Sequence, residues 1–236
     1  MSNDYLLHKR AVAEFMGTAF LLTAVVGSGI MAEQLSAGNT SLALLENAIA
    51  TGAALVVLIL TFGPISGAHL NPAVTLADAS QGGIRWPAVP AYIAAQGAGA
   101  IVGVFAAHAM FGQRIFQVSV HVRSGTPQLI SEFIATFGLL ATIWGCSRFR
   151  IGAIPFAVGA YIMSAYWFTA STSFANPAVT LARGFTNTFA GIRPMDTPGF
   201  ICAQLLGAFA ATFLFRWLTP SLPEKAPEIL VEHERG

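Results

Sequence analysis

The chain has 236 residues, of which 55% are hydrophobic and only 10% are charged. Soluble domains carry roughly 25% charged residues, so this composition excludes an ordinary soluble fold and indicates a membrane protein. The formal net charge of +1 excludes a strong field for nucleic acid, and the two cysteines, Cys146 and Cys202, lack the spacing of a disulfide framework or a metal site.

Hydropathy along the chain predicts six membrane-spanning helices, because each apolar stretch approaches the length of about 20 residues that crosses a bilayer. In chain order they cover about Ala11–Ile30, Ala43–Phe62, Pro87–Met110, Leu129–Cys146, Gly152–Ala170 and Pro198–Leu218. The first stretch follows basic residues, as a signal peptide does, but Glu14 inside it and the spans that follow favour a retained helix. The expected fold class is therefore an all-α membrane protein.

The segment NPAVTLA occurs twice, at residues 71–77 and 176–182, each time between two expected spans. Asn is a favoured N-cap and Pro suits the first helical position, so each copy predicts a short helix with a positive N-terminal end. Each copy is too short to cross a bilayer of about 30 Å. We therefore expect two half-helices whose ends point at something polar inside the membrane.

The two halves of the chain repeat beyond this segment. Glu14 opens the first span and Glu132 the fourth, while Gln96 in the third span matches Gln204 in the sixth. Three spans in each half place the second half upside down relative to the first, and this inverted repeat brings both half-helices to the midplane. The expected organisation is a single domain over residues 1–236, with repeat 1 at about 10–110, repeat 2 at about 129–218 and a cytosolic tail at 220–236.

The distribution of Lys and Arg predicts the orientation. With the N-terminus inside, the inner segments hold eight of these residues and the outer segments hold four, which favours cytoplasmic N- and C-termini. The tail, Pro220–Gly236, is rich in Glu and Pro and is expected to be disordered. We expect a multi-pass protein of the cell inner (plasma) membrane.

The two NPA boxes, the run SGAHLNPAVTLA at Ser66–Ala77 and the repeat-related Glu14 and Glu132 resemble the aquaporin, or major intrinsic protein, family. The resemblance covers about residues 10–218. It implies six tilted helices and two half-helices around a pore, in a homotetramer with one pore per subunit. It also implies that the partners are small neutral solutes, water and the lipid bilayer, with no cofactor, no metal and no nucleic acid.

The midplane of such a pore is expected at the two NPA motifs. Each Asn caps its own half-helix and leaves amide N–H groups to donate into the lumen. A passing water or hydroxyl must offer its oxygen there, which breaks a chain of donors and disfavours protons and cations. Helix capping alone is the alternative, but an identical pair at inverted-repeat positions favours the pore role. The motif residues are Asn71, Pro72, Ala73, Asn176, Pro177 and Ala178.

The residues expected at the constriction differ from the usual filters of the family. The family usually has Arg directly after the second NPA, where this chain has Val179. Counting back from the two asparagines maps the other positions of the ring to Thr51, Ser164 and Ser173. Such a ring is wide and mildly polar. It resembles neither a water filter, with an aromatic residue, His and Arg, nor a glycerol filter, with Arg and aromatic walls.

Three polar residues beside the NPA segments are candidates for the vestibules: His69, Asp78 and Arg183. Arg183 follows Val179 by four residues, so it lies on the same helical face one turn further out, and Asp78 is its repeat equivalent. The alternative for both is that they are solvated residues at the ends of the half-helices. His69 either lines the inner vestibule or has a structural role.

Glu14 and Glu132 are carboxylates inside the membrane, and such residues are candidates for proton relays. The alternative, with which the family resemblance agrees, is a structural role in which each accepts hydrogen bonds from the backbone of a re-entrant loop.

A wide ring without a fixed guanidinium suits uncharged solutes larger than water, such as small polyols, urea and undissociated arsenite. The chain resembles the bacterial members of the family that have Val after the second NPA and have been linked to arsenite handling. The expected function is a passive channel for arsenite- and glycerol-type solutes and water. A water-selective aquaporin and a proton-coupled transporter that uses Glu14 and Glu132 are the alternatives. An enzyme is not indicated, because no nucleophile–base pair, metal cluster or nucleotide-binding loop stands out.

Overall fold

Six long α-helices and two short ones form most of the part of the chain that the structure describes. The structure is a computed structural model and describes residues 5–219; the expected cytosolic tail lies outside these residues. The long helices are α1 (Leu7–Leu35), α2 (Thr40–Ser66), α4 (Val89–Met110), α5 (Thr126–Phe149), α6 (Ile154–Phe168) and α8 (Thr197–Leu218), and the short ones are α3 (Pro72–Gln81) and α7 (Pro177–Ala182).

All six predicted spans are present. Each is long and apolar enough to cross a membrane, and within residues 5–219 the regular structure is entirely helical, which confirms the all-α membrane fold. Four of the helices, α4, α5, α6 and α8, begin with Pro in the first turn, where its missing N–H is not needed. The ends differ from the hydropathy prediction where 3₁₀ turns, Trp86–Ala88 and Ile151–Ala153, precede α4 and α6.

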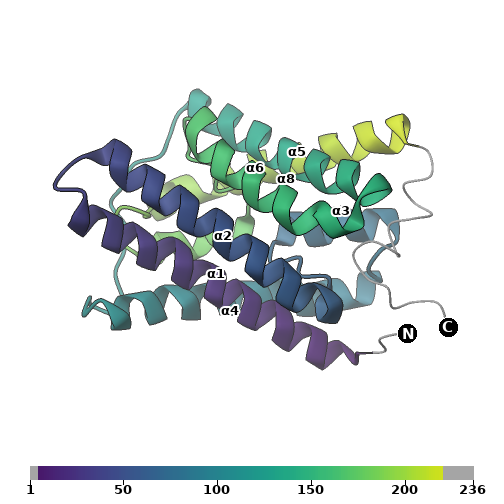
Figure 1. Cartoon of the computed structure of the whole chain (residues 1–236), viewed down its shortest axis with the longest axis horizontal. Helices are drawn as coiled ribbons and strands as arrows, with labels where there is room; N and C mark the ends of the chain where they lie inside the picture. The colour runs from purple at the N-terminus through teal and green to yellow at the C-terminus, as the bar shows by residue number, and fades with distance from the viewer. Residues whose placement is uncertain (1–4, 220–236) are drawn as a thin grey trace.

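The two halves are packed in the same way. In the first half α1 packs along α4 and α2, and in the second half α5 packs along α8 and α6, while α2 and α6 join the halves. Figure 1 shows α1, α2 and α4 on one side of the bundle and α5, α6 and α8 on the other, with α1 beginning at the end where α8 finishes.

Glycines allow the paired helices to approach closely. A Cβ atom on Gly99 of α4 would overlap the carbonyl oxygen of Phe15 in α1, and one on Gly207 of α8 would overlap the carbonyl oxygen of Phe133 in α5. These two contacts are repeat equivalents. Because lipid offers no hydrophobic drive for association, such backbone-to-backbone packing contributes much of the attraction between membrane helices.

Each half-helix is buried in the apolar core of the other half. Ala73, Val74 and Ala77 of α3 pack with residues of α5, α6 and α8 around Trp144. Val179, with its neighbours on α7, packs with residues of α1 and α4 around Leu22. The half-helices therefore lock the two repeats together.

The loops that lead into the half-helices have a strained backbone. Ala68 and Leu70 before α3 have φ of 47° and 50°, and Ser173 and Ala175 before α7 both have φ of 50°. Residues with a Cβ atom adopt this left-handed region only when their surroundings hold them there. The same pattern in both loops places the start of α3 and the start of α7 in matching positions.

Candidate functional site

A cavity lies between the two halves and is lined by both half-helices, by the loops that precede them and by α1, α2, α5 and α6. Its volume is about 80 Å³. Most of its wall is aliphatic, with Leu, Ile and Val side chains from the four long helices. Seven polar side chains interrupt this wall: Thr51, His69, Asn71, Tyr166, Ser173, Asn176 and Arg183. An apolar wall with a few placed polar groups is typical of a site for small molecules.

Asn71 and Asn176 join the two half-helices where these meet. The Oδ1 atom of each caps its own helix, by accepting from the N–H of Ala73 at 2.9 Å and of Ala178 at 2.9 Å. The Nδ2 atom of Asn71 donates to the carbonyl oxygen of Ala175 at 2.8 Å, and that of Asn176 donates to the carbonyl oxygen of Leu70 at 2.7 Å. An amide NH₂ group has two hydrogens, so each Asn keeps one donor for a molecule in the cavity.

The carboxylate of Glu14 holds the first loop. It is fully buried and accepts hydrogen bonds from the backbone N–H groups of His69 at 2.9 Å and Leu70 at 2.7 Å. It also accepts from the side chains of Ser66 at 2.7 Å and Gln96 at 2.8 Å. These bonds satisfy backbone groups that have no water to bind at membrane depth.

Glu132 holds the second loop in the same manner. It accepts from the backbone N–H groups of Phe174 and Ala175, both at 2.9 Å, and from Gln204 at 2.6 Å. Gln204 donates as well to the hydroxyl of Thr180 on α7. Both carboxylates therefore have the contacts of the structural alternative, in which they position the half-helices.

Three of the four residues predicted for the selectivity ring line the cavity: Thr51, Ser173 and Val179. Ser164 does not belong there, because it is exposed on the outer face of α6. Residues 162 and 166 share the inner face of this helix, and residue 164 lies on the opposite face at about 100° per residue. Tyr166 lines the cavity instead, and its hydroxyl lies 3.2 Å from Thr51 Oγ1. Thr51, Tyr166, Ser173 and Val179 therefore line the cavity together, and Tyr166 adds an aromatic hydroxyl that the sequence mapping missed.

Arg183 lies at one end of the cavity, which we name the second-half mouth and define by Phe174 and Arg183. Its side chain lines the cavity, as expected for a vestibule residue, and the residue is only 2% exposed, which disagrees with the solvated alternative. The guanidinium carbon lies 3.4 Å from the centroid of the Phe174 ring, and Nε donates to the carbonyl oxygen of Ala190. The ring face and this bond fix the cation beside the pore.

Arg123 supports the same mouth and was not found by sequence reasoning. Its guanidinium carbon lies 5.0 Å from the Phe174 centroid, and its Nε donates to the carbonyl oxygen of Gly191 at 2.8 Å. Burial lowers the pKa of Arg123 from its ordinary value. The residue lies in the loop before α5, where no periodic pattern singles it out. Phe174 could have been found, because it is the repeat equivalent of His69.

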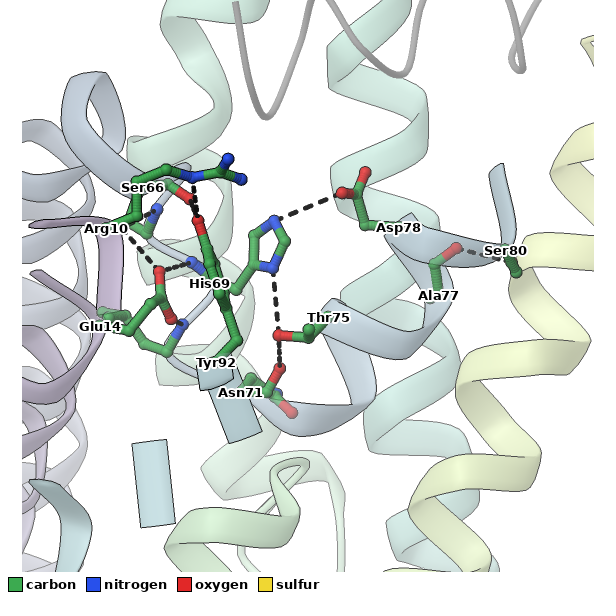
Figure 2. A network of polar contacts seen from close by, with 12 residues as sticks. Arg10, Glu14, Ser66, His69, Asn71, Thr75, Ala77, Asp78, Ser80 and Tyr92 are labelled. Atoms are coloured by element: carbon green, nitrogen blue, oxygen red, sulfur yellow. Dashed lines mark hydrogen bonds and ion pairs between the residues drawn. The ribbon is translucent and has the colours of Figure 1, made fainter. Parts of the chain in front are cut away.

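The opposite end is the first-half mouth, defined by His69 and Asp78. Figure 2 shows the His69 ring between Thr75 and Asp78. Nδ1 lies 3.1 Å from Thr75 Oγ1, and Nε2 lies 3.5 Å from a carboxylate oxygen of Asp78. His69 lines the cavity, whereas Asp78 is fully buried and contacts the ring from α3. Asp78 is therefore not among the residues that line the cavity, and its burial also disagrees with the solvated alternative.

Tyr92 and Arg10 extend this cluster on the side of α1 and α4. The hydroxyl of Tyr92 accepts from Nε of Arg10 at 2.8 Å and donates to the carbonyl oxygen of Ser66 at 2.8 Å (Figure 2). The Tyr92 and His69 rings lie with their centroids 5.3 Å apart. Within residues 5–219, no group of three or more His, Cys, Asp or Glu side chains could hold a metal ion.

The fold and the cavity together define a membrane channel built as an inverted repeat, with two capped half-helices that meet at its centre. The sequence profile described as Major intrinsic protein matches residues 1–153. This chain therefore belongs to the major intrinsic protein family, whose members are channels and not enzymes.

Several relatives share most of the chain. It is 54% identical over 229 residues to the aquaglyceroporin AqpS of Rhizobium meliloti (strain 1021), covering 95% of this chain and 98% of the relative. It is 38% identical over 180 residues to the aquaporin NIP1-3 of Oryza sativa subsp. japonica, covering 73% and 62%. It is 32% identical over 166 residues to the glycerol uptake facilitator protein of Streptococcus pneumoniae, covering 64% and 70%.

A solved structure has the same fold. The X-ray structure of the aquaglyceroporin from Plasmodium falciparum superimposes with a TM-score of 0.70 at 24% sequence identity, covering 92% of this chain and 99% of that one. The likeness supports the arrangement of helices and half-helices described above.

Proposed function

We propose that this chain is a passive channel for small uncharged solutes that carry hydroxyl groups, such as glycerol and undissociated arsenite, and that water passes as well. The observation that carries the proposal is the ring Thr51, Tyr166, Ser173 and Val179. It has Val where the family usually has a guanidinium, and its three hydroxyl groups lie in a wall that is mostly aliphatic. A solute with a carbon or metalloid body and several hydroxyl groups matches both parts of this lining.

The names of the relatives support this solute class. Two of the three are an aquaglyceroporin and a glycerol uptake facilitator. The two asparagine donors in the cavity add to the argument, because a hydroxyl oxygen accepts from them as readily as a water oxygen does.

Neither alternative fits the contacts as well. A water-selective filter needs a narrow ring with a fixed cation, and the ring position after the second NPA is the aliphatic Val179. A proton-coupled transporter would need Glu14 and Glu132 to change their bonds during a cycle. Each of these carboxylates holds two backbone N–H groups of a strained loop, so its release would free buried donors at a cost of about 1–3 kcal/mol each.

We further propose a single channel domain that works as a homotetramer in the plasma membrane, with both termini in the cytoplasm. The count of Lys and Arg on the two sides supports the orientation. In this proposed orientation, the second-half mouth with Arg183 lies outside and the first-half mouth with His69 lies inside. Large apolar side chains exposed on the helices, such as Val57, Leu206 and Phe213, suit contact with lipid or with a neighbouring subunit.

Permeability measurements on proteoliposomes test the function. Stopped-flow light scattering with water, glycerol, urea and arsenite in parallel should show each solute moving down its gradient and never accumulating. In Val179→Arg, the new side chain would fill the ring and seek Ser173 and nearby carbonyl oxygens. We expect glycerol and arsenite permeability to fall about tenfold or more, and water permeability to fall less.

Val120→Arg is the matched control, because Val120 is 69% exposed on the loop before α5 and the same side chain is introduced away from the cavity. The proposed filter is wrong if Val179→Arg leaves the ratio of glycerol to water permeability unchanged. Accumulation of solute against its gradient would replace the channel with a transporter.

A further inference from the structure

The second-half mouth carries hydrogen-bonding groups that the protein itself does not use. Of the five N–H donors of a guanidinium, only the one on Nε of Arg183 has a partner among the residues that the structure describes, the carbonyl oxygen of Ala190. The four on Nη1 and Nη2 remain, at a side chain that lines the cavity.

Ser173 provides a second and independent sign of a binding site. Ser173 is only 3% exposed and lines the cavity. Its hydroxyl oxygen nevertheless has no hydrogen-bond partner among the described residues. Buried polar atoms are nearly always paired, so an unpaired hydroxyl in a cavity wall indicates a group supplied from within the cavity. Tyr166, whose hydroxyl pairs with that of Thr51, lines the same cavity.

We propose that Arg183, Ser173 and Tyr166 form a solute-binding site at the second-half mouth, one helical turn beyond Val179, which takes neutral molecules with two or more hydroxyl groups and rejects cations. The terminal nitrogens of Arg183 donate to one hydroxyl oxygen of the solute. The hydroxyl groups of Ser173 and Tyr166 accept a hydrogen bond from, or donate one to, a second hydroxyl group of the solute. Rejection follows from the fixed charge, since a second cation in a cavity with low-dielectric walls is strongly repelled.

Phe174 and Arg123 give this site its rigidity. The guanidinium groups of Arg183 and Arg123 both lie over the Phe174 ring. This ring makes an edge-to-face contact with Phe200, with centroids 5.3 Å apart. The backbone N–H of Phe174 is held by Glu132. The cation at the mouth is therefore attached, through one aromatic ring, to the same carboxylate that positions α7. Two guanidinium groups near one ring also add their potentials, which strengthens the barrier to cations.

This inference rests on the proposed function, and its test separates the two. Proteoliposomes with the parent, Arg183→Gln, Arg183→Lys and Ser173→Ala are compared for glycerol, water and methylammonium permeability. Arg183→Gln removes the charge and keeps an NH₂ group, and we expect methylammonium permeability to rise about tenfold or more. Arg183→Lys keeps the charge, so it should leave methylammonium near the parent value while glycerol permeability falls.

Ser173→Ala removes the unpaired hydroxyl alone. We expect it to lower glycerol permeability about threefold relative to water and to leave methylammonium unchanged. Arg114→Gln, at an exposed position in the loop before α5, makes the same charge change away from the cavity and should behave as the parent.

Several outcomes would overturn the inference. It fails if Arg183→Gln admits no more methylammonium than Arg114→Gln does. If Arg183→Gln does not assemble, Ser173→Ala decides, and an unchanged ratio of glycerol to water permeability refutes the site. A parent that passes neither glycerol nor arsenite overturns the proposed function instead, whereas the methylammonium measurement still reports on Arg183.

Discussion

Asn176→Asp tests the barrier to cations at the centre of the cavity. The substitution exchanges an amide NH₂ for a carboxylate oxygen and leaves the shape almost unchanged. The remaining oxygen still caps α7 by accepting from Ala178 and Val179. The donor to the carbonyl oxygen of Leu70, at 2.7 Å, is lost and an oxygen faces that carbonyl instead. We expect a loss of stability of about 1–3 kcal/mol.

The effect on cations follows from the charges at the junction. Each half-helix presents the equivalent of about +0.5 charge at its N-terminus. A cation about 4 Å from one such end, at an effective dielectric constant of about 20, is repelled by about 2 kcal/mol, and by about 4 kcal/mol from both ends together. A carboxylate at the same distance attracts it by about 4 kcal/mol. The attraction to the carboxylate therefore cancels the repulsion from the two helix ends. Because about 1.4 kcal/mol corresponds to a factor of ten, a change of about 4 kcal/mol should raise cation permeability about a thousandfold.

Conductance in planar bilayers, or sodium flux into proteoliposomes, measures this change on protein shown to be folded and of parental oligomeric size. Asn71→Asp should act similarly, because Asn71 donates to the carbonyl oxygen of Ala175 in the equivalent geometry. Asn187→Asp is the control, because Asn187 is exposed. Its Oδ1 atom accepts a hydrogen bond from the N–H of Val120, and a carboxylate oxygen at the same place can accept this bond too. Unchanged ion flux in folded Asn176→Asp would refute the assignment of the barrier to the asparagines and helix ends.

Two further substitutions test how the scaffold holds the site. Glu132→Gln leaves one acceptor oxygen for three donors, so we expect the melting temperature to fall by roughly 5 °C or more. Downhill solute flux should be retained at about pH 5 and at about pH 8. If the parent shows a proton-coupled uptake and the variant loses it, the result supports the transporter instead. Gly207→Ala forces a Cβ atom against the carbonyl oxygen of Phe133, so helix α8 must shift and thermal stability should fall. Gly97→Ala, where a Cβ atom meets open space on α4, should be neutral or stabilising by up to about 1 kcal/mol, and equal behaviour of the two glycine variants would contradict the close packing.

Much of the fold could be predicted because it depends on local signals and on a repeat. Apolar length gives the six spans, and Asn-Pro gives the start of each half-helix. The identity of the two NPAVTLA segments pairs α3 with α7, and the matched Glu and Gln residues then pair the helices that hold them. These features occur in both halves of the sequence, so each copy supports the interpretation of the other.

The ring could be predicted only in part, because it depends on helical phase. Thr51, Ser173 and Val179 lie on segments whose register is fixed near an NPA motif or by the span itself. The count to α6 crosses the loop after Phe168, where Thr172 and Ser173 have φ of 61° and 50° and the chain is not helical. An error of two residues there turns the side chain by about 200°, which exchanges Tyr166 for the exposed Ser164.

The burial of Arg183 and Asp78 depends on tertiary contacts that no sequence pattern displays. A charged residue at the end of a short helix is commonly solvated. Arg183 is buried because the chain turns back after α7 and presents the carbonyl oxygen of Ala190, and because Phe174 offers a ring face. Asp78 is buried against His69 and the backbone of Gly83, where any side chain on residue 83 would overlap the carboxylate.

The two repeats agree in the residues that build the half-helices and differ in those that form the mouths. Glu14 and Glu132, Gln96 and Gln204, and Thr75 and Thr180 make equivalent hydrogen bonds.

At the mouths, repeat-equivalent positions carry different chemistry: His69 against Phe174, Tyr92 against Phe200, and Asp78 against Arg183. In each half the residue two before the NPA asparagine packs on an aromatic ring and contacts a buried charge at the far end of the half-helix. The group is a carboxyl in the first half and a guanidinium in the second. In the proposed channel, the symmetric scaffold would therefore form the central barrier, and the different residues at the two mouths would give each mouth its own selectivity.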